Sequence, residues 1–432
     1  MTKMKDSGVK WIGQIPEDWK VCSIKQLCQD VFSGGTPDTT KSEYWDGEIP
    51  WLPSGSVQNN IIESAPKTIT QLGLEKSSTR YIPSESILLA MTGATCSNVG
   101  YLTFDSCANQ SVMAYIPKED VNSKYIYYTL IACREEILLH KNGGAQSGIN
   151  GEDCKNFKVP FINKCTQDRI VSKLDKKCGE INELIAIQEK EIEKLKEYKI
   201  SVITDSVSVG IIKNRKLKTS QIEWIEKIPE DWSEIKLKYC SYIRARLGWK
   251  GLKAEEYVSD GYPLLSAFNI KNDKLDISEI NFINQFRYDE SPEIKLQIND
   301  IILVKDGAGI GKCAVIEELK YPSTTNGSLA VITIQKYITS KFLYYFFLSK
   351  IFQKFIDRLK DGMGVPHLFQ SDLREIVIPC PSVEEQDEIV GFLEKKCNEI
   401  NVLIDKKQQK IEKLQEYKKS LIYEYVTGKK EV

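Results

Sequence analysis

The sequence predicts an α+β protein made of two related halves, and three observations predict this class. A short motif and a long helical segment each occur twice, in the same order. The regions before the helical segments hold short apolar runs broken by Gly, Pro, Asn and Ser, which is typical of strands, turns and short helices. The 432 residues suffice for two or three domains of roughly 100–200 residues each. We expect two pseudo-symmetric mixed α/β domains, separated by two long helices that form an antiparallel coiled coil.

The internal repeat carries the domain organisation. Trp11-Ile12 and the run Ile15–Trp19 recur as Trp224-Ile225 and Ile228–Trp232, a displacement of 213 residues. A second set of identities begins at Gln167-Asp168 and returns at Gln386-Asp387, displaced by 219 residues. Solenoid repeats are much shorter, about 20–50 residues, so this repeat is a duplicated domain pair.

Five consecutive segments follow from this repeat. The basic, polar passage Lys213–Lys218 suits a boundary between the halves. We expect a first domain at 1–163, a first long helix at 164–210, a linker and start of the second repeat at 211–232, a second domain at 233–382, and a second long helix at 383–432.

The two helical segments carry a heptad pattern. From about Thr166 to Val207 there is no Pro and one Gly, and apolar residues recur in alternating steps of three and four, which indicates a coiled-coil seam. The second segment repeats the same five layers, with a polar residue in the same central layer. The expected pairing residues are Leu174, Ile181, Gln188 and Leu195 in the first helix, and Leu393, Ile400, Lys407 and Leu414 in the second.

Two other arrangements of these helices remain open at this stage. Each helix could pack only on its own domain, since amphipathic helices usually serve a local core. A parallel pair would place Cys178 beside Cys397, whereas an antiparallel pair brings the polar residues Gln188 and Lys407 together. We predict the antiparallel pair, because it carries the two domains to opposite ends, and we expect cross-linking through Cys178 and Cys397 to fail.

The charge balance limits how the protein can bind nucleic acid. Lys and Arg number 59 and Asp and Glu 60, so there is no global positive field. Residues 20–160 hold 12 basic and 15 acidic residues, and residues 233–379 hold 20 and 18. Any DNA binding must therefore be local.

No apolar run approaches the roughly 20 residues that span a bilayer, and residues 1–10 do not resemble a signal peptide, so we expect a cytoplasmic protein.

Enzyme motifs are incomplete. The run Gly307–Lys312 resembles a phosphate-binding loop, but Asp306 stands where a Walker A motif needs its first Gly, and Cys313 replaces the Ser or Thr. The twelve cysteines form no Cys-x-x-Cys pair, and the two histidines lie in no zinc-binding frame. No Asn-Pro-Pro-Tyr motif of amino-methyltransferases is present. We expect no catalytic residues, no metal and no cofactor.

Three motifs give the chain a recognisable resemblance. They are Trp-Ile-Gly-x-Ile-Pro-x-x-Trp at Trp11–Trp19, Ser-Gly-Gly-Thr-Pro at Ser33–Pro37, and Gln-Asp-x-Ile-Val at Gln167 and Gln386. With these motifs the chain resembles a type I restriction–modification specificity subunit, from Gly8 to Lys429. The second domain departs from the pattern, because Tyr242–Gly251 replaces the Ser-Gly-Gly-Thr-Pro motif.

The resemblance implies a DNA-recognition role without chemistry. Each of two target-recognition domains would read one half of a bipartite double-stranded DNA target. The helices would set the spacing and dock two methyltransferase (modification) subunits. Restriction subunits would join this core to form the nuclease. The alternatives are a coiled-coil adaptor that binds proteins, and a specificity subunit of a differently organised restriction system.

The candidate DNA-binding residues lie in segments that combine Gly with basic or hydrogen-bonding side chains. Gly permits close approach to phosphate, and Asn, Gln, Arg and Lys can read base edges. Each segment could equally be a turn or a solvated strand end. We expect Arg246→Ala to affect one half-site only. The candidates are Ser33, Gly34, Thr36, Lys41, Thr92, Asn98 and Gln146 in the first domain, and Arg244, Arg246, Lys250, Lys253, Lys305, Lys312 and His367 in the second.

Overall fold

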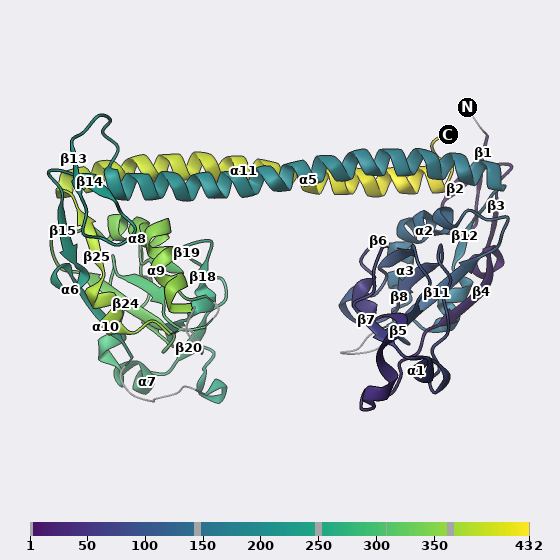
Figure 1. The fold of residues 1–432 in the computed structure, drawn as a ribbon, viewed down its shortest axis with the longest axis horizontal. Helices are drawn as coiled ribbons and strands as arrows, with labels where there is room; N and C mark the ends of the chain where they lie inside the picture. The colour runs from purple at the N-terminus through teal and green to yellow at the C-terminus, as the bar shows by residue number, and fades with distance from the viewer. Residues whose placement is uncertain (1–2, 142–147, 247–252, 308, 361–366, 432) are drawn as a thin grey trace. The chain divides into compact units, whose positions relative to one another are not determined.

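The computed structural model describes residues 3–141, 148–246, 253–307, 309–360 and 367–431 (Figure 1). The chain divides into two compact units, Met1–Glu189 with Gln409–Val432, and Lys190–Gln408. Each unit holds one mixed domain and part of each long helix, α5 (Lys164–Val209) and α11 (Val383–Val426). The predicted α+β class with two related domains is confirmed.

A five-stranded sheet forms the centre of the first domain. Its order is β4 (Cys28–Ser33), β11 (Val112–Pro117), β8 (Ile87–Ala90), β9 (Val99–Leu102) and β6 (Asn60–Ile62). Alternate residues of β8 enter different cores, because successive side chains of a strand point to opposite faces. Ile87 and Leu89 pack with helices α2 (Ser123–Ala132) and α3 (Arg134–Leu139), whereas Leu88 and Ala90 belong to the cluster on the other face. The sheet is thus buried on both sides.

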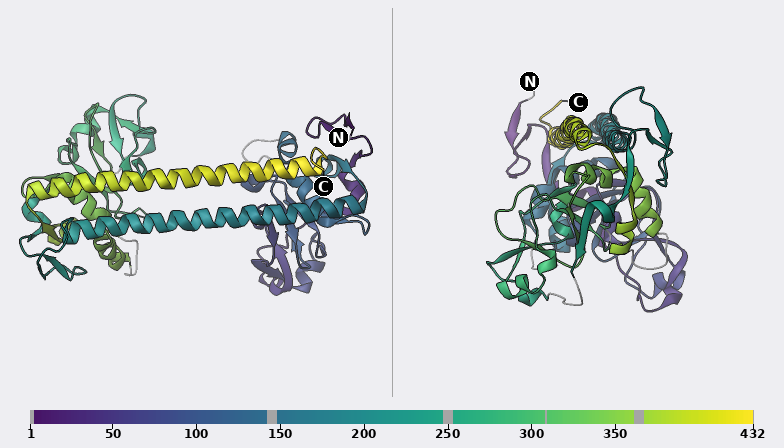
Figure 2. Two further views of the ribbon diagram at one scale, coloured as in Figure 1. Left: turned by 90° about the horizontal axis from the view of Figure 1, so that it is seen from above. Right: turned by 90° about the vertical axis from the view of Figure 1, so that its left-hand side faces the viewer.

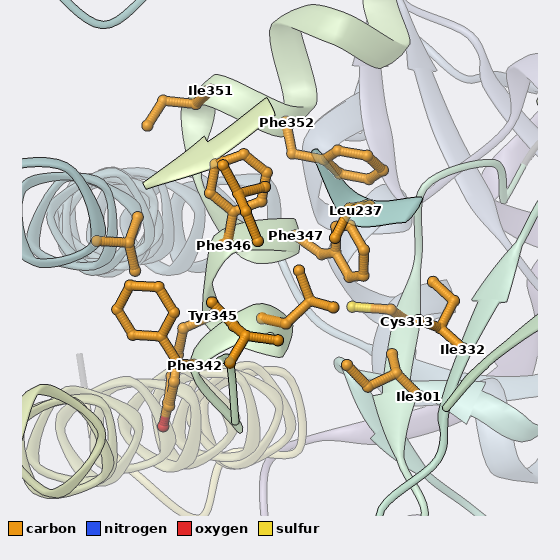
Figure 3. Close-up of a cluster of buried hydrophobic side chains, with 14 of the residues drawn as sticks. Leu237, Ile301, Cys313, Ile332, Phe342, Tyr345, Phe346, Phe347, Ile351 and Phe352 are labelled. Carbon is orange, nitrogen blue, oxygen red and sulfur yellow. The ribbon is translucent and has the colours of Figure 1, made fainter. Parts of the chain in front are cut away.

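The second domain repeats this plan. Its main sheet has the order β16 (Ser241–Ala245), β24 (Leu329–Ile334), β21 (Ile301–Val304) and β22 (Cys313–Val315). Helices α8 (Ser340–Leu348) and α9 (Lys350–Lys360) cover one face. Figure 3 shows part of the core that results, with Phe347 on the side of α8 that faces Cys313 and Ile332, and Phe342 on the side nearer the long helices.

Smaller elements complete both domains. Three-stranded sheets have the orders β10 (Cys107–Ala108), β5 (Trp45–Leu52), β7 (Lys67–Ile69), and β20 (Asn281–Ile283), β17 (Tyr262–Leu265), β23 (Thr324–Thr325). The strand pairs are β3 (Lys20–Ser23) with β12 (Lys158–Phe161), β15 (Ser233–Lys236) with β25 (Val377–Cys380), and β18 (Ile270–Lys271) with β19 (Lys274–Leu275). The short helices are α1 (Gln71–Glu75), α4 (Gly151–Asn156), α6 (Leu237–Cys240), α7 (Gln285–Asp289) and α10 (Gln370–Glu375). No helix among the described residues has the length and apolar character needed to cross a membrane.

The repeated tryptophan motif covers the end of a long helix in each unit. It closes a hairpin, β1 (Met4–Asp6) with β2 (Gln14–Pro16) in the first unit and β13 (Leu217–Thr219) with β14 (Lys227–Pro229) in the second. Trp19 packs in one cluster with Tyr425 and Val426 of α11. Trp232 packs with Val207 of α5, and its indole N–H donates to Glu385 Oε2 at 2.9 Å. The motif therefore serves to bury the end of one long helix in each unit.

The long helices pair antiparallel in both units, as predicted (Figure 2). In the first unit, Leu174 and Ile181 from the start of α5 share a core with Leu421 from the end of α11. In the second unit, Cys397 from the start of α11 shares a core with Ile203 from the end of α5. Each helix also packs on its own domain, so the local-core alternative describes part of the same seam.

Polar residues of the seam have defined surroundings. Lys418 Nζ donates to Asn182 Oδ1 at 2.8 Å in the first unit, and Lys199 Nζ donates to Asn401 Oδ1 at 3.2 Å in the second. Lys407 pairs with Glu191 at 2.6 Å. These cross-helix bonds satisfy the polar groups that interrupt the apolar layers.

A buried glutamine fastens each domain to its long helix. Gln167 Oε1 accepts a hydrogen bond from the backbone N–H of Asn122, at the start of α2, and its amide donates to the Ile162 carbonyl. Gln386 Oε1 likewise accepts from Thr339, at the start of α8, and its amide donates to the Pro381 carbonyl. The repeated Gln-Asp motif thus places the same end of each sheet beside the helices.

Candidate nucleic-acid interface

The candidate loops of the first domain converge at one end of the main sheet. Strand β11 is antiparallel to β4 and β8, with Met113 opposite Ser33 and Val112 opposite Ala90. The loops that follow β4 and β8 therefore leave the sheet at the same end. An isolated bridge between Thr92 and Gly148 brings the segment after α3 to this place. Strand β11 runs away from it towards α2 and the Gln167 contact, so the loops lie at the end of the sheet that faces away from α5.

The second domain builds the same loop end with the same backbone contacts. Ala245 lies opposite Ala330, and Val304 opposite Leu329. The bridge between Asp306 and His367 takes the place of the bridge between Thr92 and Gly148. We call these two regions the loop surfaces of the first and second domain.

Backbone hydrogen bonds show that the two loop surfaces are equivalent. The N–H of Met91 donates to Ser111 O at 2.8 Å, and the N–H of Lys305 donates to Ser328 O at 2.9 Å. The carbonyls of Met91 and Lys305 in turn accept from Ile149 and Leu368, both at 2.9 Å. The structure therefore brings together, within each domain, the segments that sequence reasoning selected separately.

On the first loop surface, several predicted side chains are accessible. Ser33 and Lys41 are exposed, and Thr36, Thr92 and Asn98 are half-buried. Lys41 Nζ lies 3.2 Å from the Tyr44 hydroxyl, and this hydrogen bond raises the pKa of Lys41, which keeps its positive charge at neutral pH. The side-chain oxygen of Asn98, Oδ1, accepts a hydrogen bond from Asn59 Nδ2 at 3.2 Å, and this bond orients the side-chain amide of Asn98.

Gly34 corrects one prediction. Gly34 was predicted to let the backbone approach a DNA phosphate closely. In the structure the residue is buried, and its N–H donates to Val112 O at 3.0 Å. A Cβ at this position would collide with the backbone of Ala108. The glycine is needed because two segments of this chain approach closely, and we remove it from the candidate DNA contacts.

On the second loop surface, Lys312 is exposed, and Lys253 of the same domain is exposed as well. Lys305 is largely covered, and its Nζ pairs with Asp306 Oδ2 at 2.9 Å. His367 is partly exposed, with Nδ1 against the Asp306 carboxylate and its ring centroid 4.4 Å from that of Phe369. Asp306 thus positions two of the predicted residues at once.

Arg244 and Arg246 were predicted to be surface contacts, and the structure places both inside the protein. Arg244 is 9% exposed, and its Nη2 pairs with Asp300 Oδ2 at 2.7 Å. Its Nη1 donates to Lys295 O at 2.9 Å. The side chain of Arg246 is 6% exposed and lies 3.5 Å from Glu290 Oε2. The prediction was wrong because the sequence does not reveal that Asp300 and Glu290 fold against this strand, so the test with Arg246→Ala loses its basis.

Two further predicted residues, Gln146 and Lys250, lie outside the described residues.

Sequence reasoning also missed side chains on the first loop surface. Gln110 meets the Thr36 hydroxyl, and Asn59 meets Asn98. Gln110 follows Asn109, which recurs as Asn326, and that repeat was the available signal.

Metal or nucleophile chemistry finds little support within the described residues. In this part of the chain, no three His, Cys, Asp or Glu side chains are grouped to hold a metal ion. Burial raises the pKa of the Cys107 thiol to about 11 and that of Cys240 to about 12, which keeps these thiols protonated and unreactive.

Two copies of one mixed domain, each with a loop surface at one end and a long helix at the other, define a duplicated recognition scaffold. A known family matches both copies, at residues 16–202 and 229–413. The chain belongs to this family, the type I restriction modification DNA specificity domain, and carries the domain twice.

Relatives of similar length support this assignment. The chain is 25% identical to the type I restriction enzyme MjaVIII specificity subunit of Methanocaldococcus jannaschii over 424 residues, 96% of this chain and 94% of that subunit. It is 32% identical to the EcoR124I/EcoR124II specificity subunit of Escherichia coli over 151 residues, 34% of this chain and 37% of that subunit.

A solved structure from work on complex assembly and conformational transition of the type I R-M system shares the fold. Its TM-score is 0.68 at 13% identity, and the match covers 95% of this chain and 98% of that one.

Proposed function

We propose that the chain is the DNA-recognition subunit of a type I restriction–modification complex, in which each loop surface reads one half of a bipartite target. The observation that carries this proposal is the equivalence of the loop surfaces. Both are built from the same strand ends and backbone bonds, yet their side chains differ, with Thr92 and Asn98 in one and Lys305 and Lys312 in the other. One scaffold with two different sets of side chains suits two different half-sites.

The chemistry of the loop surfaces fits this role. Exposed lysines such as Lys41 and Lys312 can bind phosphates, which fix the register on the duplex. Thr and Asn side chains can bond to base edges, which carry the sequence information. The near-zero net charge means that affinity depends on local contacts and on partner subunits.

The long helices are assigned two tasks. Their antiparallel seam fixes how far each helix extends past the other, and this sets the separation of the half-sites. They also dock two methyltransferase subunits, and restriction subunits join that core. Methylation and cleavage reside in these partners, and the chain itself performs no chemistry.

The experiment is methylation mapping. The chain is co-expressed with its modification subunit in a host that lacks adenine methylation, and methylated adenines are located by sequencing. We expect a two-part motif with a fixed gap. A single uninterrupted motif, or the absence of methylation at defined sites, contradicts the proposal and favours a protein-binding adaptor.

Single substitutions assign each half of the motif to a domain. Asn98→Ala should relax one half only, because loss of a base contact costs about 1–3 kcal/mol of discrimination at that position. Lys41→Ala and Lys312→Ala should weaken binding at every sequence by removing a phosphate contact. The matched controls are Lys118→Ala and Lys336→Ala, exposed lysines that follow β11 and β24 at the opposite end of each sheet. Equal effects of controls and loop variants would contradict the placement.

A further inference from the structure

A pocket of about 670 Å³ lies in the second unit, between the domain and the parts of the long helices that belong to this unit. Apolar side chains such as Phe282 and Leu319 line it, together with Lys199 of α5 and Cys397 of α11. Pockets of roughly 300–1,000 Å³ with mostly apolar walls typically bind small molecules. The size and lining of this pocket therefore suit a small ligand.

In the first domain, a tyrosine ring fills the corresponding place. Tyr101 of β9 lies opposite Ile87, the first residue of β8. Val315 of β22 lies opposite Ile301, the first residue of the equivalent strand β21. Tyr101 is 9% exposed, and Val315 lines the pocket. The second domain thus lacks an aromatic ring at a position where the first domain buries one.

The loop beside this position is longer in the second domain. Residues 103–106 connect β9 to β10, whereas residues 316–323 connect β22 to β23. Leu319 and Tyr321 of the longer connection line the pocket. A smaller side chain on the strand and a longer loop next to it together open the space.

The groups that surround Tyr101 in the first domain are repeated around the pocket. The Tyr101 ring lies edge to face with that of Tyr127, with centroids 6.2 Å apart, and Lys124 Nζ is 5.8 Å from its centre. These two neighbours are the fifth and second residues of α2. The fifth and second residues of α8 are Tyr344 and Lys341, and both line the pocket. The pocket therefore keeps the neighbours of the ring without the ring itself.

The aromatic part of the wall also keeps its geometry. The rings of Tyr127 and Tyr128 have centroids 5.3 Å apart and planes at 64°. The rings of Tyr344 and Tyr345 have centroids 5.3 Å apart and planes at 62°. Because the two pairs are oriented alike, the pocket presents the surface that packs against a phenol ring in the first domain.

The charges at the pocket are balanced. Lys341 pairs with Glu394 of α11 at 2.6 Å, as Lys124 pairs with Asp175 of α5 at 2.6 Å in the first domain. The described lining residues include four lysines and four carboxylates. They are Lys199, Lys274, Lys320 and Lys341, and Asp273, Glu317, Glu318 and Glu394. A charged ligand would lose its hydration without a surplus of opposite charge in return, so the pocket favours a neutral one.

We propose that this pocket binds a neutral aromatic small molecule, which takes the place that the Tyr101 ring occupies in the first domain. Tyr344 packs edge to face against the ligand, and Lys341 supplies a cation near its ring. The ligand also reaches Lys199 and Cys397, so it holds the second domain against both long helices. Its binding is independent of DNA recognition.

The experiment is a titration of the full chain with 2-naphthol, an uncharged two-ring aromatic alcohol whose fluorescence changes when it leaves water. We expect saturable binding at neutral pH with one site per chain. The ligand should be displaced by p-cresol, which is the tyrosine side chain as a free molecule. Naphthalene-2-sulfonate has the same rings and a fixed negative charge, and it should bind at least about tenfold more weakly.

Two substitutions exchange the filling residue between the domains. Val315→Tyr places the ring of the first domain in the pocket and should weaken 2-naphthol binding at least about tenfold, because the space is then occupied. Val315→Phe adds the ring without the hydroxyl and should do the same. Tyr101→Val opens the equivalent place in the first domain and should create a second site, as an emptied apolar cavity can bind an aromatic molecule.

The matched control is Ile298→Tyr, which adds the same ring at an exposed position of the second domain outside the pocket and should bind like the unaltered chain. Circular dichroism shows which variants are folded. Absence of 2-naphthol binding to the unaltered chain overturns the inference, and so does undiminished binding to folded Val315→Tyr and Val315→Phe variants. An equal loss in Ile298→Tyr, or a single site in folded Tyr101→Val, contradicts the equivalence of the two places on which the ligand class rests. None of these outcomes affects the proposed function, which is tested by methylation mapping.

Discussion

The two domains fill one position of the same sheet with opposite chemistry. Phe32 of β4 lies opposite Ala114, and Arg244 of β16 lies opposite Val331, so the two residues are equivalent in register. Phe32 packs in an apolar cluster, and Arg80 lies 3.8 Å from the centre of its ring. Arg244 instead reaches a fully buried carboxylate, Asp300.

The residue that faces this position from the neighbouring strand region also differs between the two domains. The register that pairs Ile87 with Tyr115 and Ile301 with Ile332 makes Ser86 the counterpart of Asp300. A carboxylate at Ser86 would be buried without a cation, because Phe32 occupies the place of Arg244. The scaffold therefore tolerates complete exchange of its buried chemistry, provided that both members of the pair are exchanged together.

The largest effect should come from breaking the ion pair of the second domain. Arg244→Ala leaves Asp300 buried and without its cation, and we expect a loss of roughly 3–5 kcal/mol in the free energy of unfolding. Denaturant unfolding of the purified chain measures this loss. Lys253→Ala, an exposed change in the same domain, should cost less than about 0.5 kcal/mol.

A double variant tests the exchange directly. Arg244→Phe with Asp300→Ser copies the pair of the first domain into the second, and replacing a buried ion pair with apolar groups is often neutral or stabilising. We expect the double variant to be more stable than Arg244→Ala. If it unfolds as easily as Arg244→Ala, the two positions are not interchangeable between the domains.

An intermediate effect should come from a feature that the domains share. Gln167→Ala and Gln386→Ala each remove a buried amide that fastens a domain to its long helix, and each should cost about 1–3 kcal/mol. Gln386 also donates to Tyr337 O at 2.8 Å, so its loss should be the larger of the two. Thermal unfolding of both variants provides the comparison. A loss at one site alone would show that the domains are held by different means.

Among the residues compared between the domains, the smallest effect should come from the cation beside Phe32. Arg80 is exposed and pairs with Asp30 at 2.7 Å, so water screens it, and Arg80→Ala should cost less than about 1 kcal/mol. The contrast with Arg244→Ala, measured in the same denaturant series, sharpens the difference between a buried and a surface cation. A loss as large as that of Arg244→Ala would refute this distinction.

The fold was largely predictable because its main signals are periodic or repeated. The heptads of Leu174, Ile181, Leu393 and Ile400 predicted a paired-helix seam, and the duplicated motifs predicted two related domains and, with them, the antiparallel direction of the pair. The role of Trp19 and Trp232 was not predictable, since the helix end that each covers lies far away in the sequence.

The site was predictable as a set of loops and less so as individual residues. Glycine and polar clusters selected Thr92, Asn98, Lys305 and His367, and strand register then brought their loops together. Arg244 failed because a basic residue in a strand gives no sign of its face or of a carboxylate 56 residues later. Gly34 failed because the sequence shows that a glycine permits a close approach but does not say to what.

Each unit contains segments of both long helices, and this determines the order in which the two units can fold during synthesis on the ribosome. The first unit needs Leu421, Tyr425 and Val426 to complete its core, whereas the second unit is complete once residue 408 has emerged. At roughly 5–20 residues per second, the part of the first unit that ends at Glu189 waits about 10–45 s for the remainder. The half that is synthesised first is thus finished last, and a nascent chain that stalls after residue 408 would carry an open seam at its beginning.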